Sequence, residues 1–363
     1  MPTRRDLLAW AATVATLSVS GLVRATSSPA RKPLDLLFLG GTGFLGPHQV
    51  EHALARGHRV TLFNRGKSAP GLYGDRVEVL TGNRDARIAP GLSALEGSRR
   101  WDAVIDNSGY VPRHVADSLA VLKGRFGRYL FVSTVAVYDT ATAGPYTESS
   151  PLRAAPAAGV EEVTGATYGP LKAECDRIVR AALGDAATIV RPTYIVGPGD
   201  DTDRFTYWVE RMALGGDVLG PPEPSSELQW VDVRDLCPWI VELVEQDKPG
   251  IFNAAGPAVP VNWEQVLREL ARGSDKPANL HWATREVLER SGVRLPLVRA
   301  TAGSAHFSGE AAQTVGLRYR PLADTAAATL AWWRSLPAER RAAAEGWPTA
   351  AQEQEALRLL AAG

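Results

Sequence analysis

The stretch that decides the fold of this 363-residue chain is Gly40-Gly41-Thr42-Gly43-Phe44-Leu45-Gly46, a glycine-rich turn between two regular segments. An apolar run from Leu34 to Leu39 precedes it and predicts a short buried strand. Pro47 to Arg56 predicts a helix, which Gly57 ends because glycine suits the left-handed position after a helix. A second strand is predicted at Arg59 to Asn64. The order strand, turn, helix, strand predicts a βαβ unit.

The alternation of strands and helices continues to about residue 198. Further strands are predicted over 77–80, 103–106, 129–134 and 187–191, and a helix over 115–123. This alternation predicts an α/β fold with a Rossmann doubly wound parallel sheet over 34–198. A smaller α/β C-terminal substrate lobe is expected over 199–320, with some return to the main sheet through short strands near 229–231 and 251–253. A helical tail is expected over 321–363.

The composition is that of an ordinary globular protein, with 45% hydrophobic and 22% charged residues. Forty Lys and Arg residues balance forty Asp and Glu residues, so the net charge is zero. This balance argues against a nucleic-acid partner, which a basic surface would attract. The two cysteines, Cys175 and Cys237, lack metal-ligand spacing. Two buried free thiols are expected, and one disulfide is the alternative.

The N-terminal sequence predicts a signal segment that is cleaved from the mature protein. Arg4-Arg5 stands before an apolar run from Leu7 to Leu22, and Val23-Arg24-Ala25 then offers the small residues that a signal peptidase reads. This pattern resembles a twin-arginine export signal over 1–25, followed by a linker over 26–33. The alternative is a membrane anchor, but the run is too short and too polar for stable membrane insertion. We therefore expect a periplasmic or extracellular protein.

The glycine turn predicts a site for a dinucleotide. Gly40 and Gly43 let the backbone turn tightly and approach a pyrophosphate, and Gly46 lets the helix pack closely on the sheet. At the end of the second strand, an NAD site usually has a carboxylate for the ribose. Here Asn64 stands at that place, and Arg65 and Lys67 follow. Two cations and no carboxylate at this place favour NADP over NAD. The alternative is that Arg65 and Lys67 are ordinary solvated charges of a loop.

A second signal is the pair Tyr168 and Lys172, which lie four residues apart. On a helix this spacing places both side chains on one face. The Lys172 ammonium, together with a positive nicotinamide ring, would lower the pKa of the phenol toward the working pH. Tyr168 could then exchange a proton with a substrate oxygen while hydride moves. The pair predicts an enzyme because it follows a glycine turn and a strand that ends at Ser133-Thr134.

The chain resembles an extended short-chain dehydrogenase/reductase of the NAD-dependent epimerase/dehydratase family. The stretches that carry the resemblance are Gly40 to Gly46, Phe131 to Tyr138, Tyr168 to Lys172, Arg191 to Asp200 and Gln229 to Asp235. Asn64-Arg65-Gly66 resembles the subgroup related to chloroplast stem-loop-binding proteins.

This resemblance implies roles for individual residues. Thr134, Tyr168 and Lys172 would be catalytic, with Thr134 bonded to the substrate oxygen and Lys172 holding the ribose. Besides these and the glycine turn, the implied cofactor contacts are Phe44, Leu45, Asn83, Ser108, Gly109, Ser133, Pro192 and Tyr194. Candidate substrate contacts are Tyr110, Thr134, Arg204, Trp230 and Arg234. The resemblance also implies a homodimer that pairs through the Tyr168 helix.

One departure from the family narrows the chemistry. Its 4,6-dehydratases carry Asp-Glu after the catalytic Thr, whereas this chain has Val135-Ala136, which cannot transfer protons. We expect an epimerase or an alcohol/carbonyl oxidoreductase acting on a small molecule, a sugar or sugar derivative. The alternatives are an exported NADP-dependent reductase of a non-sugar carbonyl, and a non-catalytic nicotinamide-sensing or RNA-binding protein. No metal is expected, because the zinc-like pattern His48-Gln49-Val50-Glu51-His52 has no evident third ligand.

Overall fold

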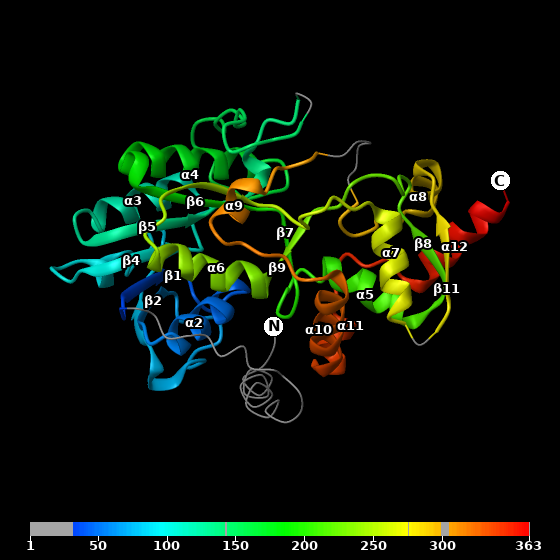
Figure 1. Cartoon of the computed structure of the whole chain (residues 1–363), viewed down its shortest axis with the longest axis horizontal. Coiled ribbons are helices and arrows are strands. Elements are labelled where there is room, and N and C mark those ends of the chain that lie inside the picture. Colours follow the sequence, from blue (N-terminus) through cyan, green and yellow to red (C-terminus); the bar gives the residue numbers. More distant parts are fainter. Residues whose placement is uncertain (1–31, 142–143, 275, 299–304, 363) are drawn as a thin grey trace. The chain divides into compact units, whose positions relative to one another are not determined.

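The computed structural model describes residues 32–141, 144–274, 276–298 and 305–362 (Figure 1). The expected export signal over 1–25 lies outside the described residues, as does most of the linker. The chain forms two compact units that alternate along the sequence. The first comprises the chain up to Ser133 together with Ala154–Ile189 and Ile240–Ile251. The second comprises Thr134–Arg153, Val190–Trp239 and the chain from Phe252 onward.

A seven-stranded sheet carries the glycine turn, with strand order β10-β6-β5-β4-β1-β2-β3. Its strands are β1 (Asp35–Leu39), β2 (Arg59–Asn64), β3 (Glu78–Thr81), β4 (Trp101–Asp106), β5 (Phe126–Val132), β6 (Ala187–Pro192) and β10 (Gly250–Ala254). The β1–β2, β1–β4, β2–β3 and β4–β5 pairs are parallel. The predicted Rossmann-like fold is confirmed. The carboxyl ends of these strands meet at one edge, where the order reverses and such sheets bind ligands.

Helices cover both faces of this sheet, with α2 (Leu45–Ala55) on one face and α3 (Pro112–Val121) and α4 (Tyr168–Leu183) packed together on the other (Figure 1). Successive side chains of a strand point to opposite faces, so Leu37 and Leu39 of β1 share a core with Val115 of α3 and Val179 of α4. Proline opens α3, where its missing N–H costs no hydrogen bond. Helix α6 (Val233–Glu245) is divided between the two units.

The second unit is built around its own apolar core, in which the rings of Trp208 and Trp263 lie 5.0 Å apart. Its strands are β7 (Tyr194–Val196), β8 (Gly216–Gly220), β9 (Trp230–Asp232) and β11 (Ala278–Trp282). Its helices are α5 (Arg204–Leu214), α7 (Trp263–Arg272), α8 (Arg285–Ser291), α9 (Glu310–Thr314), α10 (Leu322–Ser335), α11 (Ala338–Ala342) and α12 (Ala350–Ala361). A short 3₁₀ helix, Val135–Val137, lies in this unit, and three others, Gly74–Arg76, Ser93–Leu95 and Gly184–Ala186, lie in the first. Of the C-terminal helices, α10 and α12 pack into this same core.

Cys175 and Cys237 are both buried thiols that form no disulfide, as expected. Across the described ranges, no helix has both the length and the apolar character that a membrane crossing needs.

Candidate functional site

The glycine turn has the geometry that its sequence predicts. Gly40 has φ +84°, a conformation that side chains other than glycine rarely adopt. A Cβ on Gly46 would lie 2.2 Å from the carbonyl group of Gly41, so only glycine lets α2 start this close to the turn. A Cβ on Gly43 would meet nothing within 4 Å. The turn is thus tight where it packs and open at Gly43, where a ligand can approach its backbone.

The residues after β2 present positive charge to solvent. The Asn64 side chain accepts a hydrogen bond from the Gly66 amide (2.8 Å) and so shapes the turn. Arg65 and Lys67 are exposed. Neither cation has a hydrogen-bond or ion-pair partner among the residues that the structure describes. Both are therefore available to an anionic group at the end of β2.

The residues 107–110, named here the β4 loop, pass directly against the glycine turn. The Ser108 hydroxyl donates to the Leu39 carbonyl (2.9 Å), and a Cβ on Gly40 would lie 3.2 Å from that of Ser108. Gly109 is held as tightly, because a Cβ there would lie 2.5 Å from the Phe131 ring. The structure thus brings the predicted residue Ser108 against the first glycine of the turn and packs the predicted residue Gly109 against Phe131.

An ion pair that the sequence analysis missed lies under this loop. Arg84, which follows β3, makes two hydrogen bonds to the buried Asp106 carboxylate, at 2.6 and 2.9 Å. The Tyr129 hydroxyl donates to the same carboxylate (2.7 Å). Burial raises the pKa of Asp106, but the charge and hydrogen bonds of Arg84 outweigh burial, so its pKa lies below the ordinary value. The neighbouring Asn83 accepts a hydrogen bond from the Asp85 amide (3.0 Å), which orders the same turn.

Tyr168 and Lys172 occupy the first turn and a half of α4. The Lys172 side chain is buried, and its ammonium donates to the carbonyls of Gly109 and Val132, both at 2.8 Å. It also lies 4.0 Å from the centre of the Phe131 ring. Burial lowers the pKa of Lys172. The Tyr168 and Tyr110 rings are 6.4 Å apart. The structure therefore joins the predicted catalytic pair, Tyr168 and Lys172, to the β4 loop.

Ser133 and Thr134 follow β5, which ends at Val132 and not at Thr134 as predicted. The Ser133 hydroxyl is buried and has no hydrogen-bond partner in the described part of the chain. Thr134 belongs to the second unit, where its hydroxyl accepts from the Ala136 amide (3.2 Å) and caps a short 3₁₀ helix. Extended strand geometry stops there because this capping bond replaces the ladder.

The other predicted contacts in the second unit differ in their exposure. Pro192 ends β6, and the ring of Tyr194 in β7 lies 5.4 Å beneath the Arg204 guanidinium. Trp230 is buried in the core. Arg234 pairs with Asp232 (2.6 Å). Of the candidate substrate contacts, Tyr110 in the first unit and Arg204 in the second are exposed.

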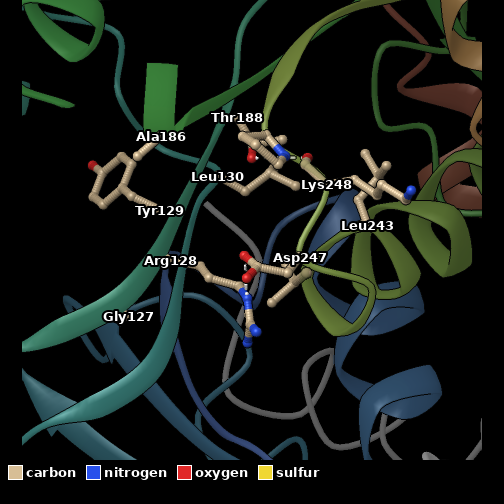
Figure 2. Close-up of a pocket in the computed structure, with 11 residues that line it drawn as sticks. Gly127, Arg128, Tyr129, Leu130, Ala186, Thr188, Leu243, Asp247 and Lys248 are labelled. Atoms are coloured by element: carbon tan, nitrogen blue, oxygen red, sulfur yellow. Dashed lines mark hydrogen bonds and ion pairs between the residues drawn. The ribbon is translucent and has the colours of Figure 1, made fainter. Parts of the chain in front are cut away.

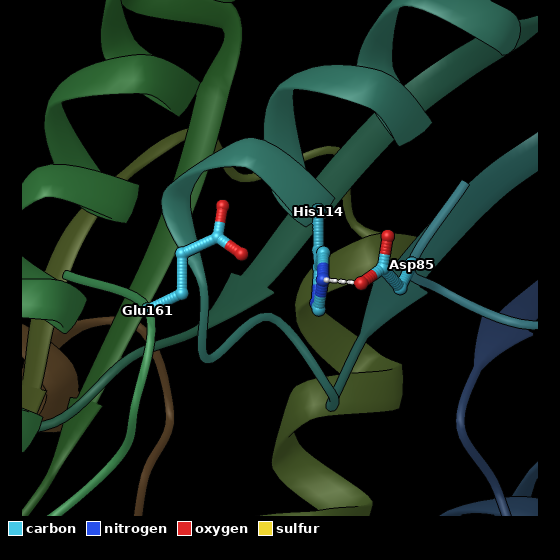
Figure 3. A group of neighbouring side chains, drawn as sticks. All are labelled: Asp85, His114 and Glu161. Carbon is cyan, nitrogen blue, oxygen red and sulfur yellow. Dashed lines mark ion pairs between the residues drawn. The ribbon is translucent and has the colours of Figure 1, made fainter. Parts of the chain in front are cut away.

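Asp85, His114 and Glu161 form a second cluster that the sequence analysis missed (Figure 3). Arg113 pairs with Asp85 (2.9 Å) and Glu161 (2.8 Å), and Arg87 pairs with the same two carboxylates. Hydrogen bonds from Arg113 and Arg87 lower the pKa of Glu161 to about 2. Because guanidinium groups already satisfy both carboxylates, the cluster suits ion pairing better than metal binding. We name these five residues the α3 clasp.

The clasp fastens the segment before Tyr168 to the turn after β3 and to α3. Replacing Glu161 with glutamine should therefore speed amide exchange over residues 160–168 in hydrogen–deuterium exchange. Because the pKa of Glu161 is about 2, its contribution should persist at about pH 4 and fade only as the pH falls toward that pKa. The control is Glu174→Gln, which breaks a surface pair with Arg177 on α4. Equal exchange in both variants would show that the clasp does not hold this segment.

A pocket of about 320 Å³ opens at the opposite edge of the sheet (Figure 2). Its lining includes Gly127 and Arg128 near the start of β5 and Ala186 and Thr188 around the start of β6. Arg128 is paired there with Asp247 (2.6 Å). Since the glycine turn follows the carboxyl end of β1, this pocket is separate from the candidate site.

Comparisons with known proteins agree with this picture. Residues 92–255 match the model of the NAD dependent epimerase/dehydratase family. The chain is 25% identical over 283 residues to the chloroplast stem-loop binding protein of 41 kDa b from Arabidopsis thaliana, covering 73% of this chain and 70% of that one. It is 26% identical over 261 residues to the 2'-dehydrokanamycin reductase of Streptomyces kanamyceticus, covering 69% and 70%.

Among solved structures, the fold is similar to that of the Bordetella bronchiseptica enzyme WbmH in complex with NAD⁺. The TM-score is 0.62 at 17% identity, covering 83% of this chain and 98% of that one. At this identity the likeness concerns the fold. The matched segment and the relatives show that this chain is similar to members of the NAD dependent epimerase/dehydratase family, and the solved structures show the same fold.

Proposed function

We propose that this protein is a hydride-transfer enzyme, an epimerase or an alcohol/carbonyl oxidoreductase that acts on a hydroxyl of a sugar or sugar derivative. One observation carries the proposal: Tyr168 and Lys172 share a face of α4, and the Lys172 ammonium is bonded to the β4 loop beside the glycine turn. Burying a charged ammonium group costs free energy unless hydrogen bonds or a bound ligand compensate for the lost water. The buried position of Lys172 therefore favours a catalytic or binding role.

The residues present fit a nicotinamide dinucleotide. The backbone at Gly43 is open, and the N-terminus of α2, where the helix dipole favours a phosphate, begins directly after it. The buried Ser133 hydroxyl, which has no partner within the described ranges, fits a group bound at the end of β5. An ammonium has three donors, and two of those of Lys172 are used, so the third is available for a ribose hydroxyl.

The mechanism follows from what these side chains can do. Tyr168 passes a proton to or from the substrate oxygen. The resemblance to the family assigns a hydrogen bond to that oxygen to the Thr134 hydroxyl. The Lys172 charge favours the ionised form of the phenol. A nicotinamide, when bound, supplies the hydride acceptor or donor. Val135 and Ala136 carry no group that transfers protons, which supports redox or epimerisation over dehydration.

The proposal is tested by native mass spectrometry of the purified protein, followed by assays with sugar substrates. A bound nicotinamide dinucleotide and turnover that depends on it are expected. An epimerase returns the hydride and leaves the nicotinamide absorbance unchanged overall, whereas a dehydrogenase or reductase changes it. A protein that neither retains nor binds NAD or NADP would defeat the proposal.

We propose NADP as the preferred dinucleotide, supported by the two unpartnered cations after β2. Replacing Arg65 and Lys67 together with alanine should weaken NADP binding by about ten- to a hundredfold, because each loses a charge-assisted bond to the ribose phosphate. NAD binding should change little, since it lacks that phosphate. The control is Lys123→Ala, another exposed cation. Isothermal titration with both dinucleotides measures this, and tighter NAD binding by the unaltered protein would contradict it.

We further propose twin-arginine export to the periplasm or the exterior, and pairing of two copies through α4. Export of a folded protein suits an enzyme that acquires its dinucleotide before export and recycles it within each turnover. Fractionation of cells that produce the full chain tests export, and replacing Arg4 and Arg5 with lysine should retain the protein inside the cell.

Sedimentation tests the pairing of two copies through α4, and a mass equal to that of one copy would contradict it.

A further inference from the structure

Arg84 joins three segments that belong to different strands. It lies in the turn after β3, directly after Asn83. Its guanidinium bridges the Asp106 carboxylate at the end of β4 and the Ser108 hydroxyl in the β4 loop (3.0 Å). Ser108 in turn donates to the Leu39 carbonyl at the end of β1. One side chain thus ties the ends of β1, β3 and β4 together at the edge that holds the glycine turn.

The β4 loop is held from the other side by α4, because the Lys172 ammonium donates to the Gly109 carbonyl (2.8 Å). The Ser108 amide donates to the same Asp106 carboxylate that Arg84 binds (3.1 Å). A shift of Arg84 would therefore displace Ser108 relative to Gly40 and Gly109 relative to Lys172. These contacts connect Arg84 to both the glycine turn and the catalytic pair.

The contacts of the Arg84–Asp106 pair favour arginine over lysine at position 84. The Asp106 side chain is fully buried, so its charge needs a partner with matching geometry. A guanidinium binds both carboxylate oxygens and still has a donor for the Ser108 hydroxyl. A lysine at this place would keep the charge but make only part of these bonds.

We propose that Arg84 is a positioning residue for the dinucleotide site: it holds the β4 loop at the distance from Gly40 and Lys172 that binding needs. The inference rests on the proposed function for the identity of the ligand. The position of the loop is a property of the chain itself and is tested without any ligand.

The first experiment measures hydrogen–deuterium exchange of the unliganded protein. In Arg84→Lys, which keeps a positive charge beside Asp106, the amides of residues 107–110 should exchange about tenfold faster than in the unaltered protein. The control is Tyr129→Phe, which removes a different hydrogen bond to Asp106 and leaves Arg84 and Ser108 in place. It should leave exchange over these residues unchanged. Unchanged exchange in Arg84→Lys would overturn the proposal.

The second experiment measures the Kd for NADP and NAD. Arg84→Lys should bind about tenfold more weakly, and so should the charge-free pair Arg84→Gln with Asp106→Asn, which buries no unpaired charge. Tyr129→Phe should bind as the unaltered protein does, although it loses stability. Equal Kd values for Arg84→Lys and the unaltered protein would overturn the proposal. If the unaltered protein binds neither dinucleotide, the proposed function fails, and the exchange data still decide whether Arg84 positions the loop.

Discussion

Replacing Tyr168 with phenylalanine should lower kcat by about a hundred- to ten-thousandfold, the usual contribution of a positioned acid or base. The substitution removes only the phenol oxygen, which is the group proposed to exchange a proton with the substrate. The ring remains, so its packing near Tyr110 should persist, and Lys172 keeps its bonds to Gly109 and Val132. The affinity for the dinucleotide should therefore fall much less than kcat does.

The matched control is Tyr207→Phe, in the core of the second unit. The Tyr207 side chain is buried, and its hydroxyl has no hydrogen-bond partner within the described residues, so removing it breaks no bond. Turnover should stay at the level of the unaltered protein. Assays of both variants at saturating substrate and dinucleotide compare the same chemical change at two places. Full activity of Tyr168→Phe would remove the acid/base role from the proposal.

Local sequence patterns predict the elements around the glycine turn because these depend on short-range forces. Strand β2 spans Arg59–Asn64 as predicted, and Gly46 packs against the turn as its place in the motif implies. Helix α2 begins at Leu45, two residues before the prediction, because Pro47 is tolerated in the first turn of a helix. Whether Tyr168 and Lys172 lie on the same face of α4 depends only on the periodicity of a helix, so their common face was also predictable.

The contacts that support the site were not predictable in the same way. Arg84 and Asp106 are 22 residues apart, and β1 and β2 lie between their strands in the sheet. They meet only because the turn after β3 carries the Arg84 side chain to the end of β4. No local pattern encodes that order. A hint was present, since Asp106 ends an otherwise apolar strand, and a buried carboxylate needs a cationic partner. Which of the chain's cations serves it is decided by the fold.

The Arg84–Asp106 pair also carries the largest expected effect on stability. Asp106→Asn should lower the free energy of unfolding by about 3–5 kcal/mol at neutral pH, because it leaves the Arg84 guanidinium buried without a counterion. The pKa of Asp106 lies below its ordinary value. The stabilisation by the carboxylate is therefore fully present above the unfolded pKa of about 3.9 and is lost as the pH falls through the folded pKa. Urea denaturation at several pH values measures both effects.

Two further variants separate the effect of burial from the effect of the unpaired charge on the free energy of unfolding. Asp35→Asn breaks the pair between Asp35 and Arg59, which is largely exposed, and should cost little because water screens it. Adding Arg84→Gln to Asp106→Asn removes the unpaired charge, so part of the lost stability should return. If Asp106→Asn costs no more than Asp35→Asn, the buried pair contributes nothing to the fold. The β4 loop would then owe its position to the packing of Gly109 against Phe131, and not to Arg84.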